Sequence, residues 1–433
     1  MNKNRTLAVG VLWGIVVLGI PLWFLSYPET TFRNPAKPLL LYAGQLVGIL
    51  GFSLYALSLM LSTRMQWIED IFGGLDKLYH THHTFGKAAF GFLVAHPLML
   101  SLRWVPEDIE KALWYMLPFH HRTEINLGSW AFWGLVLLML FTLVNKIPYD
   151  KWKITHKFMG IFFILGILHI FFLDGLVMQN LPLTIYLAFL SVLGVLSYLY
   201  KSLFFNWVNR KYTYIVIEVD RLNSQIMQVS LEPSGTQVPF VPGQFCFFSF
   251  RDVSLSREAH PYTICSTPNQ DTITITVKAL GDYTYQLYRE LRSGVPALLE
   301  GPYGRFDYSE HSYPQIWIAG GVGIAPFISW AEALDSLEVP TGFRVDLYYC
   351  VNVQADAVHN DLFNRLEQHL PGFSFHLSCA DIQGFLKARD IPGVQHKNIF
   401  ICGPKEMRQA LLKEFRELQI PNKNIFFEDF DFF

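Results

Sequence analysis

The sequence predicts a multidomain membrane protein, in which a six-helix transmembrane bundle is followed by an antiparallel β-barrel and then by an α/β domain with a parallel sheet. Of the 433 residues, 51% are hydrophobic and only 16% are charged, which is too apolar for a typical soluble protein. The long apolar runs are confined to residues 7–205, whereas charged residues recur every few positions from Arg210 onward. After Tyr212 the pattern changes to short alternating runs and then to strands that alternate with helices.

Six apolar stretches are each long enough for the roughly 20 residues that cross the hydrocarbon core of a lipid bilayer. They cover about residues 7–25, 39–61, 82–104, 127–144, 152–173 and 183–204. The first stretch starts close to the N-terminus but lacks a clear small-residue cleavage site, so we expect a retained anchor and not a signal peptide.

The orientation of the bundle follows from its basic residues. An even number of spans places both termini on one side, and basic residues are more frequent in the connections on that side: Arg64, Lys77, Lys146, Lys151, Lys153, Lys201, Arg210 and Lys211, against Arg33, Lys37, Arg103, Lys111 and Arg122 on the other side. By the positive-inside rule we expect a multi-pass protein of the cell membrane whose N- and C-termini are both cytoplasmic.

Charge and cysteine usage exclude some classes of function. A formal net charge of -2 argues against nucleic acid as a partner, because binding to phosphate backbones relies on clustered Lys and Arg. The five cysteines all follow residue 245 and form neither a CxxC pair nor an iron–sulfur spacing, which favours a reduced cytosolic environment for the second half.

Two of the spans carry a histidine near each end. His82 and His96 are 14 residues apart, which is about 21 Å of helical rise within about 40° of one face. His156 and His169 are 13 residues apart, or about 19.5 Å of rise. Ionisable side chains inside a span are functional candidates by default. Two histidines at each depth, on two helices, could hold two haems stacked across the bilayer, and bis-histidine ligation favours electron transfer.

Some alternatives remain open at this point. The alternative interpretation is that these are buried histidines bonded to nearby carbonyls, but two matched pairs favour haem ligation. The 13-residue spacing puts His156 and His169 about 140° apart, so the fifth span must bend or tighten, or its two haems must be rotated relative to one another. His83 is also 13 residues from His96 and competes with His82. The remaining candidates in the first half are expected to be solvated loop residues: His80, His120 and His121.

The next part of the chain reads as a small barrel. Residues 214–220 and 272–278 alternate apolar and polar side chains, as half-buried antiparallel strands do. Between them, the segment His260-Pro261-Tyr262-Thr263-Ile264-Cys265-Ser266 could supply the aromatic face, the donor near N5 and the diphosphate donors that a flavin needs. Gly281-Asp282-Tyr283-Thr284 opens a helical pattern, whose N-terminus is an anion site. A strand edge or an ordinary turn would explain either segment alone.

The last part reads as a doubly wound sheet. Residues 315–319 lead into Gly320-Gly321-Val322-Gly323-Ile324-Ala325-Pro326, which is followed by an amphipathic helix through Leu334. Such a strand-to-helix turn lets the backbone approach a pyrophosphate, although it is not GxGxxG and an ordinary tight connection is the alternative. Further strands at residues 344–349, 373–377 and 398–402 fit a parallel sheet, and Cys402-Gly403-Pro404 falls at a strand end where such sheets bind ligands.

Taken together, the paired histidines, HPYTICS, GPYG at 301–304, GGVGIAP, CGP and the aromatic tail make the chain resemble the NADPH oxidase and ferric reductase-like transmembrane superfamily, in particular a compact bacterial-type NADPH oxidase. The likeness covers nearly the whole length, with the motifs in family order. It implies a ferric-reductase-like haem domain at 1–207, an FAD-binding β-barrel at 208–311 and an NAD(P)H-binding domain at 312–433, the last two of the ferredoxin-NADP reductase type. The N-terminus is too short for the calcium-binding extension of some relatives, so no calcium switch is expected.

The resemblance also implies roles for individual residues. His82 and His156 would hold the cytosolic-side haem, and His96 and His169 the outer one. The expected FAD contacts are His260 and Pro261 toward the diphosphate or ribityl chain, Tyr262 at the ring and Thr263 at flavin N5, with Ser266, Lys278 and Thr284 as weaker candidates. The expected nicotinamide-dinucleotide contacts are Gly320, Gly321, Gly323 and Pro326, with Cys402, Gly403 and Pro404 near the nicotinamide. Phe430 would cover the flavin, although Phe432 and Phe433 extend the tail.

The expected function is transfer of electrons from cytosolic NADPH or NADH through FAD and two b-type haems to dioxygen on the outer face, which produces superoxide. The choice of nicotinamide stays open, because Asn352 stands where many NADPH-using relatives carry an Arg for the 2′-phosphate. Dioxygen is favoured over a ferric chelate because the outer loops show no cluster of metal ligands other than His120-His121. The alternatives are a ferric-chelate reductase with the same electron path, an electron donor to a protein partner, or a non-catalytic membrane scaffold or transporter. No obligatory protein partner is expected.

Overall fold

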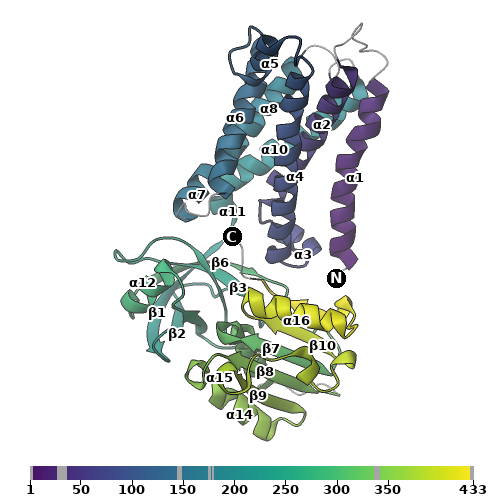
Figure 1. Cartoon of the computed structure of the whole chain (residues 1–433). Coiled ribbons are helices and arrows are strands. Elements are labelled where there is room, and N and C mark those ends of the chain that lie inside the picture. Colours follow the sequence, from purple (N-terminus) through teal and green to yellow (C-terminus); the bar gives the residue numbers. More distant parts are fainter. Residues whose placement is uncertain are drawn as a thin grey trace. The chain divides into compact units, whose positions relative to one another are not determined.

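The structure, a computed structural model, describes residues 3–26, 37–143, 149–173, 177, 180–335 and 342–429. These residues form two compact units (Figure 1). The first comprises residues 3–72 and 77–208, and the second comprises residues 73–76 and the described residues from Asn209 onward.

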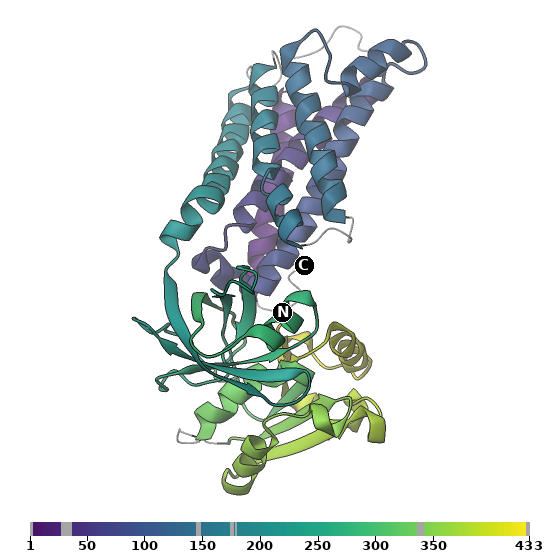
Figure 2. The same ribbon diagram turned by 90° about the vertical axis from the view of Figure 1, so that its left-hand side faces the viewer.

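The first unit is a bundle of long helices that lie side by side in both views (Figures 1 and 2). Its helices are α1 (Lys3–Ser26), α2 (Pro38–Leu61), α3 (Gln66–Phe72), α4 (Leu75–Leu102), α5 (Ile109–Met116), α6 (Thr123–Leu143), α7 (Tyr149–His156), α8 (Met159–Phe172), α10 (Leu181–Leu199), the π-helical turn η2 (Tyr200–Phe204) and α11 (Phe205–Val208). Within the described residues, six helical segments are long and apolar enough to cross a membrane, with α7–α8 and α10–α11 as the fifth and sixth. The six-span prediction is confirmed.

The outer surface of the bundle is suited to lipid. Large apolar side chains that are about half exposed line the outward faces of α6 and α10: Leu137, Leu140, Ile185, Phe189, Val192 and Leu196. A soluble monomer rarely exposes a continuous apolar surface of this kind, whereas a bilayer covers it.

The fifth span is tightened, which is one of the alternatives that the 13-residue spacing left open. Helix α7 ends at His156 and α8 starts at Met159. Between them, the N–H groups of Lys157 and Phe158 donate to carbonyls three residues back, at 3.2 and 3.0 Å. Each residue in such a turn rotates by about 20° more than a residue in an α-helix. Tightening therefore reduces the angular offset between His156 and His169.

The second unit begins with an antiparallel barrel. Its strands are β1 (Lys211–Arg221), β2 (Ile226–Pro233), β3 (Phe245–Phe250), β4 (His260–Thr263), β5 (Ile273–Lys278) and β6 (Pro296–Tyr303), in the order β4-β3-β6-β1-β2-β5. A bridge between Ile264 and Ile275 joins the two edges of this sheet. Helix α12 (Asp282–Glu290) packs against the barrel core through Leu287. The predicted barrel and the helix that starts at Gly281 are confirmed.

The rest of the second unit is a parallel sheet with helices on both faces. Its strands β7 (Gln315–Gly320), β8 (Val345–Val351), β9 (Phe373–Cys379), β10 (Asn398–Cys402) and β11 (Ile425–Phe427) have the order β11-β10-β7-β8-β9. Helices α13 (Ala325–Asp335) and α14 (Asn360–His369) cover one face, and α16 (Lys405–Glu417) covers the other. The short elements are η3 (Gly321–Ile324), η4 (Gln354–Asp356), α15 (Ala380–Gln383), η5 (Ala388–Asp390), η6 (Val394–His396) and η7 (Asn422–Asn424).

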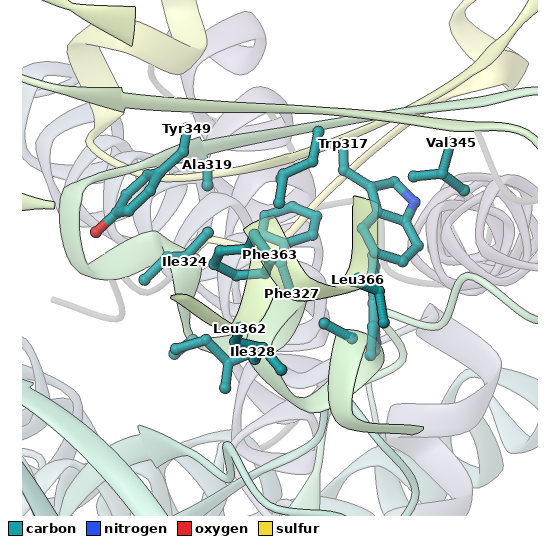
Figure 3. Close-up of a cluster of buried hydrophobic side chains, with 14 of the residues drawn as sticks. Trp317, Ala319, Ile324, Phe327, Ile328, Val345, Tyr349, Leu362, Phe363 and Leu366 are labelled. Carbon is teal, nitrogen blue, oxygen red and sulfur yellow. The ribbon is translucent and has the colours of Figure 1, made fainter. Parts of the chain in front are cut away.

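Helix α13 differs from the sequence expectation. It was expected to be amphipathic, but the structure buries it on nearly all sides. One side packs on the sheet through Phe327, whose ring centroid lies 5.8 Å from that of Trp317 (Figure 3). Trp330 lies on the same side, with its ring centroid 5.0 Å from that of Trp317, whereas the other side faces the barrel, where the hydroxyl of Ser329 donates to the carbonyl of Ser266 at 2.9 Å. Contact with two layers explains why a helix next to the glycine turn needs no polar face.

Candidate functional site

The four histidines of the third and fifth spans meet in two pairs. The ring centroids of His82 and His156 are 6.3 Å apart, and those of His96 and His169 are also 6.3 Å apart. The rings in each pair are steeply inclined, at 80° and 71°. We call His96 and His169 the far pair, because they lie at the end of the bundle where α10 starts, and His82 and His156 the near pair, because they lie at the end where the chain leaves α11 for β1.

The far pair is oriented by backbone carbonyls. The Nδ1 atom of His96 lies 2.8 Å from the carbonyl oxygen of Gly44 in α2, and Nδ1 of His169 lies 2.7 Å from that of Glu124 in α6. A carbonyl can only accept, so each Nδ1 carries the proton. In both rings, Nε2 is therefore the nitrogen that remains available to bind a metal.

The near pair is oriented less uniformly. Nδ1 of His82 lies 2.9 Å from the carbonyl oxygen of Ser58 and 3.0 Å from its hydroxyl. Among the described residues, the partner of Nδ1 of His156 is the hydroxyl oxygen of Thr142, at 3.5 Å, and this oxygen also accepts from the indole N–H of Trp152 at 3.2 Å. Of the two competing residues, His82 faces His156 with a backbone partner, whereas His83 is exposed.

The other histidines of the bundle are not all solvated. His80 and His121 are exposed, as expected. His120 is buried, so the expectation was wrong for this residue. Its ring stacks on that of His121 at 4.1 Å, and its Nδ1 accepts from the backbone N–H of Arg122 at 3.0 Å. Its backbone is held by Asn126, which exchanges two hydrogen bonds of 2.7 Å with it, because the loop folds back onto the start of α6.

In the barrel, the predicted flavin segment lies on β4 and continues into the turn after it. The His260 ring stacks on Tyr283 of α12, with centroids 3.8 Å apart and an interplanar angle of 17°. Its Nε2 lies 3.3 Å from a carboxylate oxygen of Glu258. Pro261 pairs with Phe247 across the strands. The structure thus brings the start of α12 against the first residue of the motif.

Two tyrosine side chains in this cluster have buried hydroxyl groups. The hydroxyls of Tyr262 and Tyr283 are buried and have no hydrogen-bond partner among the described residues. Burial raises the pKa of Tyr262 well above its usual range, with Tyr283 adding to the effect, and burial likewise raises the pKa of Tyr283. Both phenols are therefore neutral donors. A buried polar group without a partner is costly, so these two hydroxyls fit a site that a polar ligand completes.

The remaining flavin candidates lie around this cluster. Thr263 is buried at the end of β4, and Lys278 is half-buried at the end of β5. The hydroxyl of Ser266 accepts from the N–H of Thr274 at 3.1 Å. The hydroxyl of Thr284 accepts from the N–H groups of Leu280 and Gly281 and donates to the Gly281 carbonyl at 3.0 Å. Through these bonds, Thr284 stabilises the first turn of α12. Its contribution to a flavin site would therefore be to shape the N-terminus of this helix.

The glycine turn after β7 and the Cys402-Gly403-Pro404 turn after β10 pack directly against each other. A methyl group added to Gly320 would lie 2.7 Å from Cδ of Pro404, and one added to Gly403 would lie 2.9 Å from the backbone of Gly320. One added to Gly323 would collide with the Cys402 carbonyl. Gly321 has a φ of 51°, and Pro326 lies in the first turn of α13. Glycine is thus required here for close approach of two backbones at the carboxyl ends of adjacent parallel strands.

Cys402 lies where these two turns meet. Its thiol is fully buried, and burial raises the pKa of Cys402 well above its usual range, so it is a neutral thiol. The buried Glu428 follows β11, and a methyl group on Gly304 would lie 2.9 Å from its carboxylate. The next residue, Asp429, pairs with Arg408 at 2.5 Å. Phe430, the predicted flavin cover, lies outside the described residues.

Sequence reasoning missed several residues that orient the candidate ligands. They are Gly44, Gly48, Ser58, Glu124, Gly128 and Thr142 around the histidines, and Glu258 and Tyr283 around His260. The Gly44-x-x-x-Gly48 spacing in an apolar helix is a known signal for close helix packing and could have identified that contact. The contacts made through backbone carbonyls leave no signal in the sequence.

Comparison with known proteins gives two family matches. Residues 47–167 match the family described as "Ferric reductase like transmembrane component", and residues 211–307 match an "FAD-binding domain". The first region contains His82, His96 and His156 and ends two residues before His169, and the second contains β4 and α12.

Relatives are found for the second half. The chain is 29% identical over 226 residues to the 2-halobenzoate 1,2-dioxygenase electron transfer component of Burkholderia cepacia, covering 49% of this chain and 66% of that protein. It is 26% identical over 227 residues to the anthranilate 1,2-dioxygenase electron transfer component of Acinetobacter baylyi, covering 49% and 65%. The chain thus spans less than two thirds of either relative. A solved structure, the flavohem-like FAD/NAD binding domain of nitric oxide dioxygenase from Vibrio cholerae, has a TM-score of 0.44, 21% identity and coverage of 50% of this chain and 97% of that chain.

The family matches fall on the units that hold the paired histidines and the flavin segment. The relatives are electron transfer components of oxidoreductases. The chain therefore combines a ferric reductase-like transmembrane region with a region that matches an FAD-binding domain, which is the domain combination of the NADPH oxidase and ferric reductase-like proteins.

Proposed function

We propose that this chain is a transmembrane NAD(P)H oxidase of the cell membrane, which passes electrons from cytosolic NAD(P)H through FAD and two b-type haems to dioxygen on the outer face. One NAD(P)H supplies two electrons, so two molecules of dioxygen become superoxide, and one NAD(P)⁺ and one proton are released. The proposed domains are the haem domain at 1–207, the FAD domain at 208–311 and the NAD(P)H domain at 312–433. Both termini are cytoplasmic in this proposal.

The observation that carries the proposal is the equal 6.3 Å separation of the ring centroids in the two histidine pairs. Two metal–imidazole bonds of about 2.0–2.1 Å, plus about 1.2 Å from each coordinating nitrogen to its ring centre, add up to about 6.5 Å. Direct packing of two rings through their edges gives no reason for the same distance in two separate pairs. Nδ1 of each ring already faces an oxygen, so Nε2 is the nitrogen that fits an iron between the rings.

The second unit supplies residues that fit the other two cofactors. His260, Pro261, Tyr262, Thr263 and Ser266 would hold FAD, with the two unpartnered phenols as donors. The glycine turn and Cys402-Gly403-Pro404 would hold the nicotinamide dinucleotide at the strand ends. FAD, when bound, accepts a hydride and passes on single electrons, whereas the protein positions the reactants and excludes water.

The C-terminal tail forms part of the same proposal. Phe430 would cover the flavin until nicotinamide displaces it. The ion pair between Asp429 and Arg408 supports this role, because it holds the residue before Phe430 close to the end of β11. Replacement of Phe430 by Ala, compared with replacement of Phe433, would show which aromatic ring controls access, because only the covering residue changes the affinity for oxidised nicotinamide.

The test is an absorbance spectrum of the detergent-purified protein with FAD, recorded before and after anaerobic NADPH and then after admission of air. We expect sharp b-haem bands on reduction that disappear in air. Bands that persist in air would contradict the oxidase assignment and point to a metal or protein acceptor. Well-folded protein without haem bands would contradict the histidine assignment itself.

The acceptor needs its own assay, since a ferric-chelate reductase would use the same path. The stacked pair His120-His121 is the feature that such a reductase could use, but Nδ1 of His120 already accepts from Arg122 and is not free to bind a metal. We expect superoxide dismutase to abolish the signal of a cytochrome c assay. Unaffected reduction of ferric citrate in the absence of oxygen would favour iron.

A further inference from the structure

The contacts of the far pair are repeated on two different helices. A methyl group added to Gly48 of α2 would lie 2.6 Å from Nδ1 of His96, and one added to Gly128 of α6 would lie 2.7 Å from Nδ1 of His169. The carbonyl that accepts from each ring belongs to the residue four positions earlier, Gly44 or Glu124. Each ring thus sits over one turn of a neighbouring helix, with a carbonyl at one end and a glycine at the other.

A glycine at this position has a direct geometric effect. In an α-helix, the carbonyl of residue i is bonded to the N–H of residue i+4, so a second donor must approach that carbonyl past the side chain of residue i+4. Any side chain at Gly48 or Gly128 would occupy the place of the imidazole. The near pair is built differently, because His156 has a hydroxyl at 3.5 Å in place of a carbonyl.

We propose that Gly48 and Gly128 are positioning residues for the far pair, which allow both of its imidazoles to donate full-strength hydrogen bonds to carbonyls and so make both far ligands more electron-donating than His156. This inference rests on the proposed haem ligation. A carbonyl-bonded Nδ1–H raises the basicity of the other ring nitrogen, and the loss of such a partner typically weakens metal binding about 10- to 100-fold. A more electron-donating ligand set also stabilises the oxidised metal.

A packing role alone would make a different prediction, and the chain offers a control for it. Gly51 lies on the same helix as Gly48 and in the same interface, where an added methyl group would lie 2.9 Å from Leu93 and not near a histidine. Gly91, on the helix that carries His96, has nothing within 4 Å of an added methyl group. Ala at position 51 therefore tests tight packing, and Ala at position 91 tests the substitution itself.

The experiment compares Gly48→Ala, Gly128→Ala, Gly51→Ala and Gly91→Ala in the full-length protein. The readouts are haem content per chain and the midpoint potential of each haem, with His96→Ala as the reference for a protein that lacks the far haem. For Gly48→Ala and Gly128→Ala we expect either haem content that falls from two toward one, or two haems with the far potential raised. The near-haem signal should persist, which shows that the bundle is folded.

Four results would overturn the inference. The content and midpoint potential of the far haem could be the same in Gly48→Ala and Gly128→Ala as in Gly91→Ala. Alternatively, Gly51→Ala could change the content or potential of the far haem as strongly as they do. The change could fall on the near haem, or both haems could be lost in both variants. If the wild-type protein binds no haem, the proposed function fails and this inference fails with it. If the wild-type protein binds two haems and the variants give one of the four results above, only this inference fails.

Discussion

The hydroxyl of Ser329 donates a 2.9 Å hydrogen bond to the carbonyl oxygen of Ser266, and both residues are buried. Ser329 lies in the first half of α13, just after the glycine turn, whereas Ser266 ends the HPYTICS segment. This bond therefore connects the segment proposed to hold FAD with the helix proposed to hold the nicotinamide dinucleotide. Their relative position determines how a hydride donor meets its acceptor.

Replacement of Ser329 by Ala should slow flavin reduction. The change leaves a buried carbonyl without its donor, at a cost of about 1–3 kcal/mol, and loosens the contact between the two segments. We expect the rate of flavin reduction by NADPH to fall about 10-fold, because small misplacements of reactants are costly. Anaerobic stopped-flow absorbance measures this rate. Ser309→Ala, at an exposed position, is the control, and equal rates in both variants would argue against the coupling.

The adjacent histidines His82 and His83 provide a matched test of the near pair. We expect His82→Ala to lose one of two haems, because His82 faces His156 and is held by Ser58. His83→Ala should keep both, since His83 is exposed. A pyridine haemochrome assay gives the haem content per chain. Loss of haem in the His83 variant alone would reverse the assignment.

Tyr283 should contribute to FAD binding through its stack on His260. We expect Tyr283→Ala to weaken FAD binding about 10-fold, because an aromatic pair is worth about 0.5–1.5 kcal/mol beyond its buried area. Tyr283→Phe keeps the ring and loses only the unpartnered hydroxyl, so it should lie between Ala and the wild type. Fluorescence titration of the apoprotein with FAD measures the dissociation constants. Unchanged affinity in the Ala variant would remove Tyr283 from the site.

His359 should make the second unit less stable at acid pH. Burial lowers the pKa of His359 below its ordinary value of about 6.5, although Asp220 of β1 opposes the effect, and its Nε2 has no partner among the described residues. The unfolded chain therefore binds a proton more readily than the folded one. Stability is constant above about pH 6.5 and falls as the pH decreases through that value.

The variant that tests this is His359→Asn. His359 has a φ of 61° at the start of α14, and Asn tolerates this left-handed conformation without titrating. We expect the wild-type midpoint of thermal flavin release to drop between pH 7.5 and 5.5, and the drop to be smaller in the Asn variant. Parallel curves for the two proteins would show that another group controls the acid sensitivity.

Asn352 should influence the choice between NADPH and NADH. It is exposed directly after β8, and its carbonyl accepts from the N–H of Asp381 at 3.1 Å. Replacement of Asn352 by Arg would place a guanidinium where it can pair with the 2′-phosphate. We expect the ratio of kcat/KM for NADPH over NADH to rise at least about 10-fold. Gln354→Arg is the control for a general charge effect, and an equal rise there would contradict a specific role.

The features that the sequence predicted best are those whose signals are local. The six spans could be identified because a bilayer requires about 20 consecutive apolar residues, whatever their partners are. The depths of His82 and His96 follow from helical rise alone. The strands around residues 214–220 and 272–278 were evident because alternation reports one buried face.

The features that it could not predict depend on neighbours from distant parts of the chain. Ser58 of α2 holds His82 where it faces His156, and the burial of His120 follows from the fold of its loop onto Asn126. The nearly complete burial of α13 arises because the barrel covers its second side, at Ser329.

The sequence by itself determined the architecture, the depth of each histidine and the motifs at the strand ends, because hydrophobicity and helical or strand periodicity act along the chain. Only the tertiary structure decided which nitrogen of His82, His96 and His169 is free, because that depends on the backbone carbonyls of Ser58, Gly44 and Glu124, and every residue type carries a carbonyl. It also decided that Gly48 and Gly128 must be small, because only the packed helices bring an imidazole to each of them.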